Sequence, residues 1–112
     1  MAARLAERLN ELANQVELDA VDVARAVGTN PRTVSRWLAM TTAPQRSQRE
    51  RLLEVIAALE RLSSTLRPEA AHDWLLSPNP MLNYDKPIDL LAAGEFRRVL
   101  GAIDALADGV FV

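Results

Sequence analysis

The longest regular pattern in this sequence is a run of apolar residues that recur at alternating spacings of three and four. Such spacing puts the side chains on one face of an α-helix, whereas a half-buried strand needs alternation at every second residue. The pattern predicts a helix from Ser47, which would form a capping box with Glu50, to about Leu66. Its expected buried face is made of Leu52, Val55, Leu59, Leu62 and Leu66, widened by Leu53 and Ile56.

Similar patterns predict helices along the rest of the chain, and few β-branched or aromatic runs support strands. The expected fold class is therefore all-α, with six or seven helices. The predicted helices before Ser47 cover residues 2–14, 20–27 and 31–39, and those after it cover residues 70–76, 87–94 and 95–107. The break at Arg67-Pro68 divides the chain into an N-terminal lobe, residues 1–67, and a C-terminal lobe, residues 68–112.

Loop and cap residues set the ends of several of these helices. Gly28 is expected to end the second helix, and Asn30 to cap the third, which then begins at Pro31. Asp85 is expected to cap the short helix that begins near Lys86. Between the helices, residues 77–80 are predicted to form a rigid turn and residues 81–84 a loop.

Two short helices joined by a glycine-containing turn are typical of a helix-turn-helix. Ala24 is small where the helices would touch, Gly28 lies in the turn, and Val34 and Trp37 would anchor the second helix. This pattern resembles the Xre-type helix-turn-helix family over about residues 16–66. The resemblance implies that the second helix of the pair enters the major groove of DNA.

The outward residues of that second helix are candidates for contacts with DNA. Arginine can pair with guanine or phosphate, and hydroxyls can bond to phosphates or bases. Residues 25–51 hold six Arg and one Glu, in a chain whose net charge is −2. The predicted DNA-binding residues are Arg32, Thr33, Ser35, Arg36 and Arg46, while the competing interpretation is an interaction domain that no longer binds DNA.

A dimer is expected on the operator, because a single recognition helix reads few base pairs. The apolar face of residues 52–66 offers one route to such a dimer. The pattern is under three heptads long and has extra apolar residues at positions 53 and 56, which favours covering the core of the helix-turn-helix for most of the face, although the two uses can coexist.

The C-terminal lobe carries several short motifs in a fixed order. They are Ala71-His72-Asp73-Trp74, Ser77-Pro78-Asn79-Pro80, Lys86-Pro87-Ile88-Asp89-Leu90, Gly94-Glu95 and Gly109-Val110-Phe111-Val112. In this order and spacing, from Glu69 to Val112, they resemble the toxin-binding domain of the Xre/MbcA/ParS antitoxins of type II toxin–antitoxin systems. The resemblance implies a RES-domain toxin that degrades NAD as partner, and an antitoxin whose C-terminal segment blocks the toxin's NAD-binding cleft.

The predicted toxin-binding residues are Asp108, Gly109, Val110, Phe111 and Val112. Chain ends are usually polar, but Val110-Phe111-Val112 is apolar and would end in a carboxylate, with Gly109 as a hinge before it. It can fold back on the last helix or insert into a pocket on a partner, and the residues alone favour neither. The resemblance favours the partner, and the net charge of −4 over residues 68–112 would complement a basic cleft.

Nothing in the sequence favours an enzyme, a cofactor or a metal site. There is one His, no Cys, no Gly-rich phosphate loop and no cluster of metal ligands. No apolar run approaches the roughly 18–20 residues that span a membrane. Charged residues interrupt the start of the chain, so a signal peptide is not expected, and the absence of Cys suits a cytoplasmic protein.

The sequence therefore predicts an antitoxin that neutralises a RES-domain toxin and represses its own operon by binding promoter DNA. The alternative is a stand-alone helix-turn-helix transcriptional regulator whose C-terminal lobe only dimerises. A RES-type reading frame beside the gene would favour the antitoxin.

Overall fold

In the computed structural model, which describes residues 2–39 and 41–109, the chain folds into seven α-helices and one short 3-10 helix. The described part contains no strand, which confirms the all-α prediction. None of its helices is long and apolar enough to cross a membrane. In chain order the elements are α1 (Ala2–Gln15), α2 (Ala20–Val27), α3 (Pro31–Leu38), α4 (Arg46–Ser63), α5 (Pro68–Leu76), η1 (Pro80–Leu82), α6 (Pro87–Ala92) and α7 (Phe96–Ala107).

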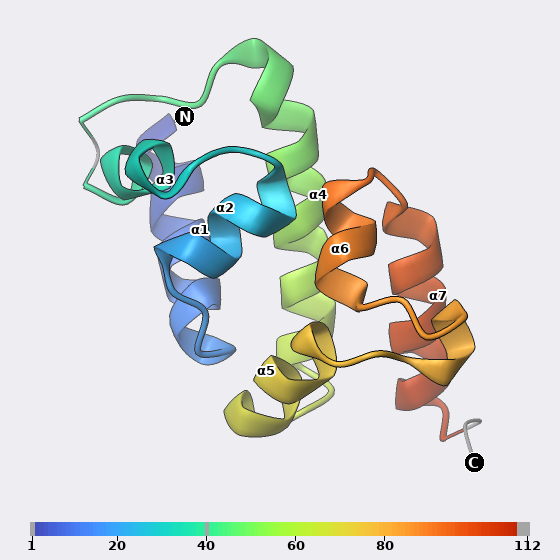
Figure 1. Cartoon of the computed structure of the whole chain (residues 1–112). Helices are drawn as coiled ribbons and strands as arrows, with labels where there is room; N and C mark the ends of the chain where they lie inside the picture. The colour runs from blue at the N-terminus through green and yellow to red at the C-terminus, as the bar shows by residue number, and fades with distance from the viewer. Residues whose placement is uncertain (1, 40, 110–112) are drawn as a thin grey trace.

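Helix α4 runs through the middle of the molecule, with α1, α2 and α3 on one side and α6 and α7 on the other (Figure 1). Its predicted apolar face is buried: Leu52, Val55, Leu59 and Leu62 are at most 1% exposed. One cluster of buried residues extends from α1 to α7, and α2 packs extensively against α6. Residues before and after position 67 therefore share a core, and the division into two lobes at that position stays a prediction.

The turn between α2 and α3 follows the sequence closely. Gly28 adopts the left-handed conformation, with φ of 83°, and ends α2. The Oδ1 atom of Asn30 accepts the N–H of Thr33 at 2.9 Å and caps α3. At the other end of α2, Asp19 and Asp22 form a capping box that the sequence analysis did not include.

The start of α4 differs from its prediction. The helix begins at Arg46 after Gln45, so Ser47 lies inside the first turn and the predicted capping box with Glu50 is wrong. The N–H groups of Gln48 and Arg49 both bond to the carbonyl of Gln45, and the Gln48 side chain donates to Thr29 Oγ1 at 3.2 Å. These bonds fix the first turn against the α2–α3 turn.

The burial and the end of α4 also differ in part from prediction. Ile56 is buried, as expected, but Leu53 is 48% exposed and does not widen the buried face. The helix ends at Ser63, three residues early, because Thr65 and Leu66 close a turn onto the carbonyl of Leu62.

Two further predictions for the C-terminal part need correction. Asp85 does not cap α6, since Lys86 is the residue before Pro87, and the backbone of Asp85 instead bonds to Leu82 and Asn79. The segment predicted as an unstructured loop begins with η1. On α7 the buried residues are Val99, Ala102 and Ile103, while Phe96, Leu100 and Leu106 are only half-buried.

Candidate functional site

The candidate DNA-binding residues lie at one end of the molecule. Arg32, Ser35 and Arg36 are exposed on α3, as an outward face requires. Thr33 differs, because its N–H and hydroxyl both donate to Asn30 Oδ1, at 2.9 and 3.1 Å. This half-buried residue is therefore engaged in capping α3, and its hydroxyl proton is already used.

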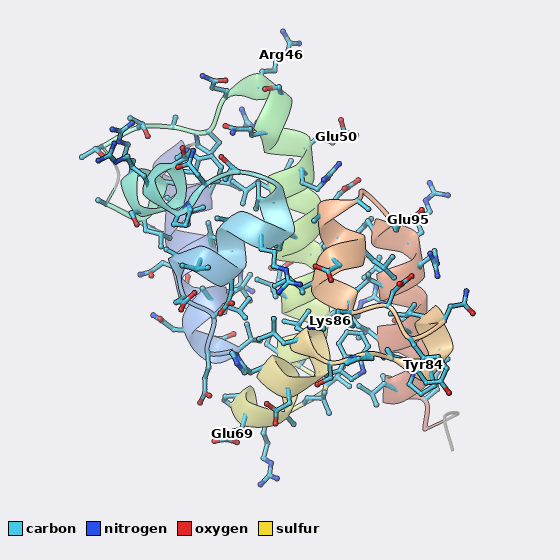
Figure 2. The ribbon with its side chains drawn as sticks, in the orientation of Figure 1. Arg46, Glu50, Glu69, Tyr84, Lys86 and Glu95 are labelled. Atoms are coloured by element: carbon cyan, nitrogen blue, oxygen red, sulfur yellow. The ribbon has the colours of Figure 1, made fainter. Side chains whose placement is uncertain are left out.

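A polar hollow lies between α3 and the segment that leads into α4. Thr33 and Arg36 line it together with Gln45, which precedes Arg46 in the chain. Arg46 is the first residue of α4 and points away from the body of the molecule (Figure 2). The fold thus brings the candidates from α3 close to the start of α4, where an elongated anion could contact both helices.

The six arginines of residues 25–51 divide into two groups. Arg25 and Arg51 make ion pairs within the chain, with Asp89 at 2.7 Å and Glu54 at 3.6 Å. The other four form no ion pair within the part of the chain that the structure describes, and all are exposed. This second group, the free arginines, is Arg32, Arg36, Arg46 and Arg49.

The two paired arginines join the α2–α4 region to α6. Besides its ion pair, Arg25 Nε donates to Asp89 Oδ1 at 2.8 Å, and Arg51 Nη1 donates to the carbonyl oxygen of Ala92 at 2.6 Å. The Ala92 carbonyl is at the end of α6, where helical carbonyls lack partners and a cation is favoured. Sequence analysis did not identify this role, because the paired residues lie 64 and 41 positions apart.

A groove of about 260 Å³ lies where the end of α5, the η1 segment and α7 meet. Trp74 packs against the core, and its half-buried ring also lines this groove. The apolar lining is completed by side chains from the link after α5, from η1 and from α7, namely Pro78, Pro80, Met81, Ala102 and Leu106. Sequence analysis treated the η1 segment only as a turn and loop, and so missed the groove.

A set of backbone bonds holds the segment beside the groove. The carbonyl of Asn79 accepts the N–H groups of Leu82 and Tyr84 at 2.9 and 2.8 Å, and Asn79 Oδ1 accepts that of Met81 at 2.9 Å. Asn83 and Tyr84 both have positive φ, 56° and 67°. Asn tolerates this conformation, whereas for a bulky residue such as Tyr it is strained by about 1–3 kcal/mol.

This strained segment presents two large apolar side chains to solvent. Met81 is 51% exposed and Tyr84 71% exposed. Tyr84 lies at the edge of the molecule near the end of α7, far from Arg46 (Figure 2). Strained residues persist where the surrounding structure holds them, and they concentrate at functional sites.

Of the predicted toxin-binding residues, the structure describes Asp108 and Gly109. Asp108 is exposed and its N–H closes the last turn of α7 onto the carbonyl of Asp104. Gly109 has a φ of 68°, as expected for a residue that turns the chain away from a helix end. Val110, Phe111 and Val112 lie outside the described residues.

The exposed carboxylates of the C-terminal part also divide into two groups. Asp89 pairs with Arg25, and Asp104 pairs with Arg61 of α4. In contrast, five exposed carboxylates have no ion pair in the described residues, so their charge is available to a partner: Glu69, Asp73, Asp85, Glu95 and Asp108. No group of three or more His, Cys, Asp or Glu that could hold a metal ion occurs in the part described.

Comparison with known proteins gives the same family at the level of sequence and of structure. A family model described as the antitoxin Xre/MbcA/ParS C-terminal toxin-binding domain matches residues 57–109. The chain is 39% identical to the mycobacterial cidal antitoxin MbcA of Mycobacterium tuberculosis, and also to that of Mycobacterium bovis, over 108 residues, which are 96% of this chain and of each relative. A probable mycobacterial cidal antitoxin of Mycobacterium tuberculosis is 33% identical over 82% of this chain and 78% of that protein.

A solved structure resembles the whole fold. A chain in the crystal structure of the M. tuberculosis MbcT–MbcA toxin–antitoxin complex superposes with a TM-score of 0.86 and 39% identity. The match covers 96% of this chain and 97% of that chain.

Proposed function

The chain belongs to the Xre/MbcA/ParS antitoxin family, and from that premise we propose that it neutralises a RES-domain toxin by covering the toxin's NAD-binding cleft. Membership in this family makes it the antitoxin of a toxin–antitoxin system and not an enzyme. The observation that carries the proposal is the likeness along the whole chain to an antitoxin, together with the match to a chain of a toxin–antitoxin complex. A stand-alone regulator loses support on the same ground.

The proposed mechanism is occlusion by the C-terminal segment. Helix α7 ends at Ala107, and Gly109 adopts the left-handed conformation that commonly follows a helix end. The next residues, Val110 and Phe111, are apolar, and an aromatic ring inserted into a pocket is a typical anchor of a protein interface. A ring in the cleft would exclude NAD, the toxin's substrate. The antitoxin itself would catalyse no reaction.

Electrostatics support the same contact. A cleft that binds NAD must accommodate a pyrophosphate and therefore tends to be basic. The carboxylates Asp73, Asp85 and Asp108, which are exposed and make no ion pair with described residues, lie on the C-terminal part of the chain. Complementary charge of this kind speeds encounter and sets orientation more than it raises affinity.

The second part of the proposal is autorepression through DNA binding. The free arginines lie on α3 and at the start of α4, at the other end of the molecule from Tyr84 (Figure 2). Their charge is not neutralised by carboxylates in the described residues and is available to phosphates and guanine edges. A dimer on a two-fold symmetric operator would place two copies of α3 in successive major grooves.

The test of occlusion is inhibition kinetics. The toxin encoded in the same operon is purified, and its consumption of NAD is measured at increasing concentrations of the full chain. If the antitoxin covers the NAD-binding cleft, it competes with NAD, and the apparent inhibition constant increases linearly with the NAD concentration. The double variant Arg32→Ala/Arg36→Ala serves as control and should inhibit as the unchanged chain does. Inhibition that is independent of NAD concentration would place the antitoxin elsewhere on the toxin.

A further inference from the structure

The exposed apolar side chains of this protein are unevenly distributed. Among the described residues, the large hydrophobic side chains that are exposed are Val21, Leu53, Met81 and Tyr84. The first two precede residue 57, where the match to the toxin-binding domain begins. Within the matched residues 57–109, therefore, the exposed large hydrophobics both lie on the segment beside the apolar groove.

Both side chains belong to the segment that forms one wall of the groove. Met81 lines the groove, and Tyr84 is fixed through its N–H to the Asn79 carbonyl, whose residue also lines it. Tyr and Met are suited to interfaces, because Tyr offers a large rigid ring with a polar tip and Met adapts its shape to a partner. Tyr84 combines a positive φ with a side chain that is 71% exposed, so packing of the ring within the chain does not offset the backbone strain.

The groove is also continuous with the segment proposed to enter the toxin. Leu106 lines the groove from the last turn of α7, three residues before Gly109. A toxin that received the segment after Gly109 would lie against this same end of the molecule. The exposed Asp73 and Asp85 adjoin groove-side residues in sequence, so a partner surface here should be basic around an apolar centre.

We infer that the groove lined by Trp74, Met81 and Leu106 is a second docking point for the toxin. The groove would receive an apolar side chain of the toxin from the basic surface beside the toxin's cleft. This inference rests on the proposed toxin neutralisation. It separates two tasks: the groove supplies affinity, and the segment after Gly109 blocks the cofactor. In protein interfaces, a few side chains that are buried in pockets from which water is excluded contribute most of the binding energy.

The test compares two groove variants with a matched control. Met81→Asn replaces an apolar side chain of the groove with a polar one without adding a charge, and Tyr84→Asn removes the ring while keeping a residue type that accepts positive φ. Leu53→Asn is the control, since Leu53 is 48% exposed, much like Met81, but lies on α4 outside the groove.

Circular dichroism melting of each full-length chain verifies the fold. Calorimetric titration with catalytically inactive toxin from the same operon measures affinity, and sedimentation of each chain alone measures self-association.

We expect both groove variants to weaken toxin binding by about tenfold or more, as the loss of a central interface contact does. The control should bind as the unchanged chain, and saturating amounts of either groove variant should still stop NAD consumption. Unchanged affinity in both groove variants would overturn the inference. If a groove variant sediments differently but binds the toxin with unchanged affinity, the groove is a contact between copies of this chain. If a groove variant binds the toxin more tightly, the groove holds the chain's own C-terminal segment. Either result also overturns the inference.

Failure of the proposed function gives a different result. In that case the unchanged chain would itself not bind the toxin, whereas failure of this inference alone leaves the unchanged chain and the groove variants binding equally well.

Discussion

Arg51 on α4 donates a hydrogen bond of 2.6 Å to the carbonyl oxygen of Ala92, the last residue of α6. The same side chain lies 4.0 Å from the position that a Cβ on Gly28 would take, and 3.0 Å from that position on Gly94. One guanidinium group therefore contacts the end of α6 while standing close to the turn between α2 and α3. It links the region of the free arginines to the helices that precede the proposed toxin-binding segment.

Replacing Arg51 by Met should destabilise the protein. The methionine keeps part of the apolar stem but leaves the Ala92 carbonyl without its charged partner. A hydrogen bond to a charged group contributes about 1.5–3 kcal/mol, and because this side chain is 31% exposed we expect the lower end of that range. Urea unfolding measures the change. Arg49→Met, at an exposed position without an ion pair in the described residues, is the control and should change the free energy of unfolding by less than about 0.5 kcal/mol.

Gly94→Ala should also destabilise the fold. Its φ of 83° disfavours any L side chain by roughly 1–2 kcal/mol, and the new methyl group would meet Arg51 Nη2 at 3.0 Å. Gly101→Ala is the matched control, because Gly101 lies within α7 and nothing approaches its Cβ position within 4 Å. That substitution should stabilise the protein by about 0.4–1 kcal/mol. Thermal melts that rank the two variants in the opposite order would contradict the described packing at the end of α6.

The apolar face of α4 should behave as part of the core and not as an exposed contact between two chains. Leu59 is 1% exposed, so Leu59→Ala should cost roughly 2–5 kcal/mol of unfolding free energy. Leu53→Ala on the same helix should cost less than about 0.5 kcal/mol, because Leu53 is 48% exposed. Urea denaturation at two protein concentrations distinguishes the alternatives. If Leu59→Ala changed only how the unfolding midpoint depends on protein concentration, and not the stability of the monomer, the apolar face of α4 would be a contact between two chains.

Operator binding should depend on the free arginines. The double variant Arg32→Ala/Arg36→Ala should lose the operator shift in gel mobility assays and keep toxin binding. For Arg46→Ala, the slope of log affinity against log salt should fall by about 0.9 if its single phosphate contact is lost. Arg97→Ala, an exposed arginine on α7, is the control and should shift operator DNA normally. Normal shifts by the double variant would remove α3 from the DNA interface.

Local sequence signals predicted much of this fold because they act over a few residues. Gly28, Asn30 and Pro31 were assigned correctly, since each residue type has a specific preference at a helix end. The apolar face of α4 was predicted correctly for Leu52, Val55, Leu59 and Leu62, because their spacing places them on one helical face. Leu66 was included in that prediction but lies beyond the helix and is half-buried.

The errors occurred where distant contacts decide the structure. Ser47 has the right type and spacing for a cap, but the bond between Gln48 and Thr29 fixes α4 with an earlier start. Asp85 likewise has a good capping side chain, but its backbone is held by Asn79 and Leu82.

The candidate site was predictable to different degrees. Exposure of Arg32, Ser35 and Arg36 follows from helical periodicity. The roles of Arg25 and Arg51 could not be read from spacing, because their partners come from α6. The groove was missed for the same reason, since α5, η1 and α7 meet only in the folded chain.

The most direct test of occlusion is NAD consumption by the operon's toxin in the presence of a chain truncated after Gly109. The truncated chain should keep the melting temperature and operator binding of the full chain, because it retains the whole buried core that the structure describes, which ends at Ile103. We expect it to bind the toxin through the remaining surface, with lower affinity, while NAD consumption resumes at saturating antitoxin. If the truncated chain still protects NAD as well as the full chain does, residues 110–112 do not block the cleft and the proposed mechanism is wrong.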